Sequence, residues 1–159
     1  NASGGGGATD ERRCRVIYVG IDPGANGGMA WINGNYIGVI PFREKGAMLD
    51  QWGIWARYDE SLGIVLEQVH AMPKNGVAGM FKFGQNFGWW QGIVEAHGWG
   101  FTLVTPQKWQ KHLGCMTKGD KNVTKAFASE LVKQSGGSIK VTHTIADAIC
   151  LAEYARRTA

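Results

Sequence analysis

The chain has 159 residues, of which 44% are hydrophobic, and this length and composition are typical of a single globular domain with its own apolar core. Its net charge of +4 suits an acidic partner, and no run of about 18 apolar residues occurs, so we expect no membrane partner. Three cysteines, an odd number without the paired spacing of a zinc site, favour a reducing compartment over a disulfide framework.

The first residues, NASGGGGATDERR, lack an initiator methionine and contain four consecutive glycines. We expect residues 1–13 to be a disordered tail or a remnant of an expression tag. Residues 14–159 are expected to form one domain, and no signal peptide is visible.

A central strand is predicted from Val16 to Asp22. Its residues are mostly β-branched or aromatic, and apolar side chains occupy both alternating faces, as in a strand in the middle of a sheet. Pro23 and Gly24 break the strand, so Asp22 is expected where the sheet meets solvent. A carboxylate at such a tip is costly to desolvate unless a cation or a proton compensates it.

The remaining elements predict a mixed sheet covered by helices. Asn33-Gly34 is a hairpin signal between the second and third strands, and Thr105 with Pro106 starts a helix directly after the fifth strand. The predicted ranges are strands over 28–34, 36–41, 62–69 and 100–104, and helices over 47–57, 77–97, 106–114, about 121–133 and about 142–157. We therefore expect an α/β fold with a five-stranded mixed sheet, a three-strand antiparallel meander plus two parallel strands, flanked by helices.

Three acids are embedded in apolar elements: Asp22 and Glu67 at the ends of two strands, and Asp147 in the last helix. His143 precedes Asp147 by four residues and therefore lies on the same helical face. If that helix crosses the two strand tips, these side chains converge. The repulsion between the carboxylates then has to be offset by divalent cations.

Carboxylate oxygens suit hard ions such as Mg²⁺ or Mn²⁺, and two such ions about 4 Å apart can drive phosphodiester cleavage. Taken singly, each of these residues could have an ordinary structural role instead of a catalytic one. Asp22 could be a turn residue, Asp147 the partner of a lysine, and His143 a capping or packed residue. The combination of all of them is more specific than any one.

Lysines concentrate in residues 105–140, where seven lysines occur with two acids and no arginine. This excess of positive charge favours a polyanion partner, although the lysines could also form a solvated helical face. They are Lys108, Lys111, Lys118, Lys121, Lys125, Lys133 and Lys140.

The longest predicted helix, over residues 77–97, carries Gly84, Gly88 and Gly92 at intervals of four, so that they form one stripe. A stripe without side chains allows another backbone to come close. It could pack on the sheet of its own chain or form a dimer seam with a second subunit.

Five segments resemble, in this order, the RuvC family of Holliday-junction resolvases, and they look most like its phage-encoded and chloroplast branches. They are GIDPGANGG, LEQVHAMPKNG, FKFGQNFGWWQG, TPQKWQKHLG and HTIADAICLAEYA, and the resemblance spans Val16 to Arg157. It implies an RNase H-like nuclease domain, a homodimer, and Mg²⁺-dependent symmetric nicking of four-way DNA junctions. The enzyme would be a crossover junction endodeoxyribonuclease with two Mg²⁺ or Mn²⁺ ions per site and no organic cofactor.

The resemblance also implies roles for single residues. Asp22, Glu67 and Asp147 become catalytic carboxylates that bind metal, and His143 lies near the fourth catalytic, metal-binding group. The usual bacterial spacing would instead put that group at Thr144, where this chain departs from the pattern.

DNA contacts are expected from the loop after Glu67 and from the basic segment. His70 takes the place of an aromatic residue that meets unstacked bases, and Lys74 with Asn75 would lie near the cut. The expected backbone contacts are Lys108, Lys111, Lys118, Lys121 and Lys125.

Other functions remain open at this point. A nuclease for RNA–DNA hybrids or structured RNA would use the same fold, and a non-catalytic junction-binding protein would keep the lysines without needing the acids. An actin-like phosphate-binding fold fits less well, because no second D-x-G turn occurs. A dinucleotide-binding turn also fits poorly, because Asp22 precedes the glycines. The resolvase reading places the protein in the cytoplasm of a bacterial or phage-infected cell, or else in an organelle matrix.

Overall fold

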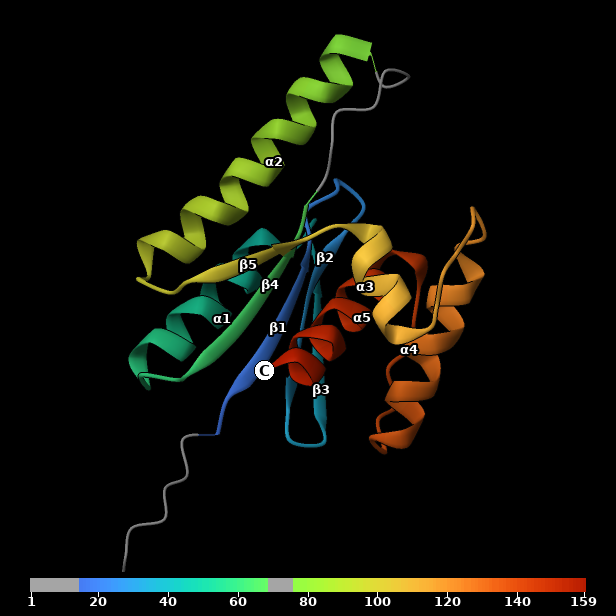
Figure 1. Cartoon of the computed structure of the whole chain (residues 1–159). Coiled ribbons are helices and arrows are strands. Elements are labelled where there is room, and N and C mark those ends of the chain that lie inside the picture. Colours follow the sequence, from blue (N-terminus) through green and yellow to red (C-terminus); the bar gives the residue numbers. More distant parts are fainter. Residues whose placement is uncertain (1–14, 69–75) are drawn as a thin grey trace, which may run out of the picture.

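The computed structural model describes residues 15–68 and 76–159. Five strands form one sheet in the order β3-β2-β1-β4-β5 (Figure 1). Their bounds are β1 Ile17–Asp22, β2 Gly28–Asn33, β3 Tyr36–Pro41, β4 Leu62–Glu67 and β5 Phe101–Val104. The first three strands pair antiparallel, whereas β4 lies parallel to both β1 and β5. The predicted five-stranded mixed sheet, a meander plus two parallel strands, is confirmed.

Helices cover both faces of this sheet. Their bounds are α1 Lys45–Arg57, α2 Gly76–Ala96, α3 Pro106–Leu113, α4 Asn122–Gln134 and α5 His143–Thr158. Helices α1 and α2 lie on one side, and α3, α4 and α5 on the other, so that each side has its own apolar cluster (Figure 1). None of the helices in the described part of the chain is long and apolar enough to cross a membrane.

Strand β1 is the centre of the molecule, as its composition predicts. Ile17, Val19 and Ile21 point into the cluster under α1 and α2. On the opposite face a Cβ at Gly20 would overlap backbone atoms of Ala148 and Ala152, so this glycine allows α5 to lie directly on the strand. This close contact positions the first half of α5 beside the carboxyl end of β1.

The bounds of several elements differ slightly from the predicted ranges. Strand β4 ends at Glu67 rather than running to residue 69, because its neighbour β5 ends at Val104, whose carbonyl accepts the last bond, from the Gln68 N–H at 2.7 Å. Helix α3 begins as expected after Thr105, whose side chain accepts a hydrogen bond from the Lys108 N–H. It ends at Leu113, and Gly114 follows as the C-cap with a φ of 71°.

The glycine stripe of α2 does not pack on the sheet. Gly84, Gly88 and Gly92 are exposed, and among the described residues no atom lies within 4 Å of a Cβ placed on any of them. Helix α2 is instead held by Trp90 and Val94, which are fully buried. The alternative in which the stripe packs on its own sheet is therefore wrong, and the dimer seam stays a prediction.

Candidate active site

One pocket of about 840 Å³ opens where the carboxyl ends of β1 and β4 meet the start of α5. The glycine turn after β1, helix α2 and the residue before α4 complete its wall. The lining residues are Asp22, Gly24, Ala25, Asn26, Gly27, Glu67, Phe83, Lys121, His143, Thr144 and Asp147. The four residues predicted to be catalytic thus lie in one pocket, although they come from three distant parts of the sequence.

Asp22 is the last residue of β1, and the Pro-Gly turn folds back over its carboxylate. The Gly24 N–H donates a hydrogen bond to Asp22 Oδ1 at 3.1 Å. A Cβ at Gly27 would come within 2.7 Å of the carboxyl carbon, so only glycine fits there. Burial raises the pKa of Asp22 to about 6, the negative charge of Asp147 adds to this, and the Gly24 hydrogen bond opposes it.

Glu67 is the last residue of β4 and is only 8% exposed. The Trp109 Nε1–H donates a hydrogen bond to Glu67 Oε1 at 2.8 Å. Burial, with smaller contributions from the charges of Asp22 and Asp147, raises the pKa of Glu67 to about 8, although the Trp109 hydrogen bond and the charge of Lys121 oppose this rise. The charged form of Glu67 is therefore only partly compensated by the chain.

Asp147 reaches the same pocket from α5. Burial raises its pKa, and the polar side chain of nearby Thr124 and the positive charge on Lys121 oppose this effect. His143 lies one turn earlier on the helix, at its first residue, and is exposed at the pocket wall. A protonated His143 also lowers the pKa of Asp147. Three carboxylates from β1, β4 and α5 thus influence one another electrostatically.

Lys121 lies among these acids, whereas the sequence had suggested only a DNA-backbone contact for it. Its charge lowers the pKa of Asp22, Glu67 and Asp147. Its own side chain is exposed, and in the described ranges no ion pair within 4 Å joins it to any acid. The single ammonium of Lys121 therefore only partly offsets the three carboxylates, and their pKa values stay raised.

The donor chemistry of this pocket fits a divalent cation. Among residues 15–68 and 76–159, no three His, Cys, Asp or Glu side chains lie close enough together to form a preorganised metal cage. The carboxylates are hard oxygen donors, however, and their pKa values are raised mainly by burial and only partly lowered by the charge of Lys121, so a divalent cation would favour their charged forms. Asp22, Glu67 and Asp147 are the residues that would hold Mg²⁺ or Mn²⁺.

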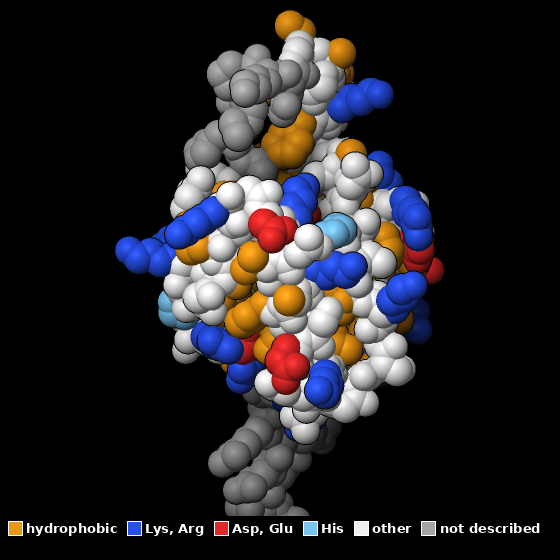
Figure 2. Space-filling view, turned by 90° about the vertical axis from the view of Figure 1, so that its right-hand side faces the viewer, with side chains coloured by type: hydrophobic (Ala, Val, Ile, Leu, Met, Phe, Trp, Pro, Cys, Tyr) orange, Lys and Arg blue, Asp and Glu red, His pale blue; other side chains and the backbone are white. Residues whose placement is uncertain are grey.

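The other predicted DNA-binding residues that the structure describes do not line the pocket. Lys108, Lys111 and Lys118 are exposed on α3 and in the loop after it, and Lys125 is half-buried on α4. Figure 2 looks onto this side of the molecule and shows Lys and Arg side chains spread over it, with fewer Asp and Glu between them. His70, Lys74 and Asn75 lie outside the described residues.

Three residues around the pocket were not selected from the sequence. Trp109 donates a hydrogen bond to Glu67, Thr124 lies near Asp147 and donates to the Lys121 carbonyl, and Phe83 lines the pocket from α2. The only signal for Trp109 was its place in the PQKWQKHLG segment, one turn into a helix that starts at the end of a strand. Nothing in the sequence distinguishes Thr124 from the other hydroxyl side chains near it.

Comparisons with known proteins identify the fold. No protein-family model matches the sequence, and no curated protein matches it either. Two structures of RuvC from Thermus thermophilus do match. One, in complex with a Holliday junction substrate, is 14% identical with a TM-score of 0.57 and covers 90% of this chain and 96% of that chain. The other is 16% identical with a TM-score of 0.56 and covers 89% and 96%. The chain therefore has the RNase H-like fold of RuvC, with a pocket lined by three carboxylates at the carboxyl ends of its central strands.

Proposed function

We propose that this protein is a structure-specific DNA endonuclease that resolves four-way junctions by paired, symmetric nicks through two-metal-ion hydrolysis. The observation that carries the proposal is the meeting of Asp22, Glu67 and Asp147, all with raised pKa values, in one pocket of a RuvC-like fold. Carboxylates arranged in this way need an external cation, and a phosphodiester brings the charge that such cations neutralise. The Thermus thermophilus RuvC structure with a bound Holliday junction supports the choice of substrate.

Bound divalent ions would supply Lewis acidity for the phosphate and lower the pKa of an attacking water. The chain's own residues would position those ions and the DNA. Asp22 and Glu67 point from the strand tips and Asp147 from the helix, so that the carboxylates surround the reacting phosphate from different elements. The Lys121 ammonium would meet a phosphate oxygen, and a ring nitrogen of His143 at the pocket wall would accept or donate a proton.

The exposed lysines of α3, its following loop and α4 would bind the arms of the junction. Backbone contacts of this kind are independent of sequence and weaken as salt rises. Lys108 and Lys111 lie on the same helix as Trp109, which contacts Glu67. Phosphate contacts on α3 would therefore place the DNA backbone next to the pocket.

Symmetric cleavage requires two pockets, and one chain supplies one. We therefore propose a homodimer, since a two-fold axis would place two equal pockets on two strands of like polarity. The stripe of Gly84, Gly88 and Gly92 is exposed on α2 and remains the candidate seam.

A nicking assay with labelled substrates tests this function. A four-way junction, a linear duplex and an RNA–DNA hybrid are incubated with the full chain in Mg²⁺, in Ca²⁺ and in EDTA. We expect paired nicks at the junction crossover in Mg²⁺ only, with binding but little cleavage in Ca²⁺, whose looser coordination positions the reacting groups poorly.

Other outcomes would point to other functions. Preferential cleavage of the hybrid would replace the resolvase proposal with an RNase H-like activity. Junction binding without cleavage in Mg²⁺ or Mn²⁺ would leave a non-catalytic junction-binding protein.

A further inference from the structure

Three tryptophans are fully buried in the described part of the chain, and their indole N–H groups differ in whether they have a hydrogen-bond partner. Trp52, Trp90 and Trp109 each have no exposed surface. Within the described residues, the N–H groups of Trp52 and Trp90 have no hydrogen-bond partner. The N–H of Trp109 donates to Glu67 Oε1 at 2.8 Å. The single satisfied indole is thus the one directed at a carboxylate of the pocket.

The local fold determines this direction. Glu67 pairs with Val104 in the parallel sheet, and Thr105 caps α3 immediately after that pair. Trp109 follows one turn into α3, where its backbone N–H bonds to the Thr105 carbonyl at 3.2 Å. The indole packs in the core cluster under α5, together with Leu113 of the same helix. It therefore cannot move away from Glu67 without disturbing α3.

The hydrogen-bond donor to Glu67, the Trp109 indole, carries no formal charge. An indole N–H can orient a carboxylate but cannot neutralise its charge, because it is a donor without a formal charge. It occupies Oε1 of Glu67 and leaves Oε2 free of any hydrogen bond among the described residues. An arginine at this place would compensate the charge that a divalent cation is expected to compensate.

We propose that Trp109 is a positioning residue, which holds the Glu67 carboxylate so that its second oxygen faces the divalent cation and which joins α3 to the pocket. This inference rests on the proposed function, since it assumes that Glu67 binds metal. Trp109 itself touches neither DNA nor metal. Its role is comparable to that of the outer hydrogen-bond partners that fix the ligands of metal sites.

The test compares Trp109→Phe with Trp52→Phe. Both changes replace a fully buried indole by a phenyl ring, but only the first removes an N–H that has a partner. Single-turnover nicking of a four-way junction and Mn²⁺ binding by calorimetry are measured on the full chain, with thermal unfolding as a check on folding. We expect Trp109→Phe to weaken Mn²⁺ binding and nicking by roughly 10–100-fold, as loss of an outer partner does, and Trp52→Phe to change both less than about 2-fold.

A second measurement does not depend on the folding of any Trp109 variant. The chain has seven tryptophans, so the wild-type ¹H–¹⁵N spectrum contains up to seven indole resonances, which are assigned through their own backbone signals. Addition of Mg²⁺ should shift the Trp109 indole resonance and leave that of Trp52 in place. The Glu67→Gln variant, which keeps an acceptor oxygen, should lose this Mg²⁺ response.

The outcomes separate the two proposals. If the wild type nicks junctions and binds Mn²⁺ but Trp109→Phe behaves as the wild type does, the positioning role is wrong and the proposed function stands. A Trp109 indole resonance that does not shift on addition of Mg²⁺ overturns the positioning role in the same way. A wild-type chain that neither nicks nor binds Mn²⁺ overturns the proposed function and this role together.

Discussion

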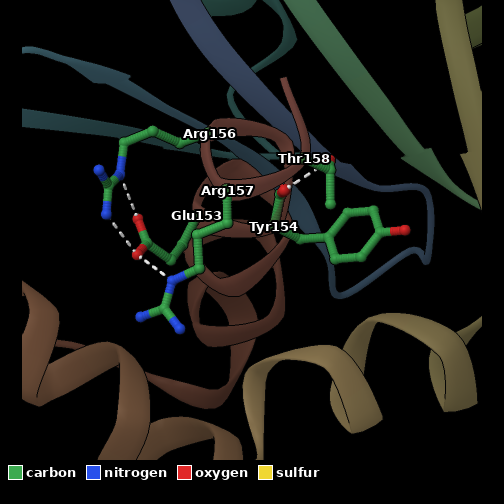
Figure 3. Close-up of polar contacts among 5 residues, drawn as sticks. All are labelled: Glu153, Tyr154, Arg156, Arg157 and Thr158. Atoms are coloured by element: carbon green, nitrogen blue, oxygen red, sulfur yellow. Dashed lines mark hydrogen bonds and ion pairs between the residues drawn. The ribbon is translucent and has the colours of Figure 1, made fainter.

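Helix α5 carries a half-buried acid, Asp147, and a fully buried acid, Glu153, whose surroundings are opposite. Asp147, in its first half, lies in the pocket, where burial raises its pKa. Glu153, in its second half, is only 1% exposed and accepts three hydrogen bonds of 2.7 Å from Arg156 and Arg157 (Figure 3). Burial raises the pKa of Glu153, but the arginines outweigh this effect and lower it below its ordinary value.

The two acids differ in which groups compensate their negative charge. The cations for Glu153 come from the chain itself, at the third and fourth residues that follow it on the helix. The hydrogen-bond donors to Asp22 and Glu67 are neutral groups, the Gly24 N–H and the Trp109 indole. Charge compensation is complete at the Glu153 end of α5 and only partial, from Lys121, at the Asp147 end, and the proposed divalent cations would supply the rest.

The largest effect is expected when a pocket acid loses its charge. Asp22→Asn keeps the shape of the side chain and an acceptor for the Gly24 N–H but removes a cation ligand. Junction nicking should fall by roughly 10²–10³-fold or more, the scale for loss of one electrostatic group at a reacting centre. Junction affinity in Ca²⁺, measured by gel shift, should stay within about 3-fold of the wild type, since phosphate contacts dominate it. Full nicking activity in Asp22→Asn would contradict the role of Asp22 as a cation ligand.

The next effect concerns stability at the other end of α5. Glu153→Gln removes the charge that holds Arg156 and Arg157, and should lower the free energy of unfolding by about 1.5–3 kcal/mol, the range for hydrogen bonds to charged groups. Because the folded pKa of Glu153 is lowered, its contribution is present above the ordinary pKa of glutamate and is lost as pH falls through the folded value.

Urea denaturation at pH 7 and pH 4 measures this change. The stability difference between wild type and Glu153→Gln should shrink at the lower pH. Nicking by the folded variant should match the wild type, and a loss of nicking comparable to that of Asp22→Asn would contradict a purely structural role.

A stability effect of opposite sign is expected for Glu67. Its pKa is raised to about 8, so without metal its ionisation destabilises the folded state progressively as pH rises from about 4.5 through 8. Glu67→Gln removes this penalty and keeps the acceptor for Trp109. In EDTA at pH 8 its Tm should therefore lie above that of the wild type, and at pH 4 the two should coincide.

Mg²⁺ sharpens this prediction. It should raise the Tm of the wild type at pH 8 more than that of Glu67→Gln, because the ion supplies the charge that the carboxylate lacks. Differential scanning fluorimetry can follow both variants in parallel. Equal Tm values in EDTA at pH 8 would show that Glu67 is already compensated by the chain.

The smallest effect is expected when a basic side chain is replaced. Arg156 is engaged by Glu153, whereas Lys108 is exposed on α3 and has no ion-pair partner among the described residues. Lys108→Gln should weaken junction binding by a few fold and reduce the slope of log K against log salt by about 1. Lys133→Gln, at the last turn of α4 and outside the predicted contacts, is the matched control. Equal salt slopes for both variants would remove Lys108 from the DNA-binding surface.

The sequence predicted the strand tips well because strand and turn signals are local. The β-branched run before Asp22 and the Pro-Gly break after it determine both the strand and its end. Asp147 was predicted because it is an acid between apolar residues of the last helix. Glu153 also lies between apolar residues of that helix and fits the same criterion, but it was not predicted. The signal that separates them is local as well: arginines three and four residues later on the same helical face.

Site residues whose positions depend on the packing of helices against the sheet could not be predicted from the sequence. The direction of the Trp109 indole depends on the register of β4 and β5 and on where α3 starts, which are contacts between distant segments. Lys121 enters the pocket because the loop before α4 brings it beside three acids. Its position in the sequence does not distinguish it from the other lysines of the basic segment.

The central claim is that the pocket acids share cations which the chain does not supply. Calorimetric titration of Mn²⁺ into the wild type, Asp22→Asn and Glu153→Gln tests it most directly. The account predicts binding to the wild type and to Glu153→Gln with similar affinity, and binding at least about 10-fold weaker to Asp22→Asn. Equal Mn²⁺ binding by Asp22→Asn and the wild type, or none by either, would contradict it.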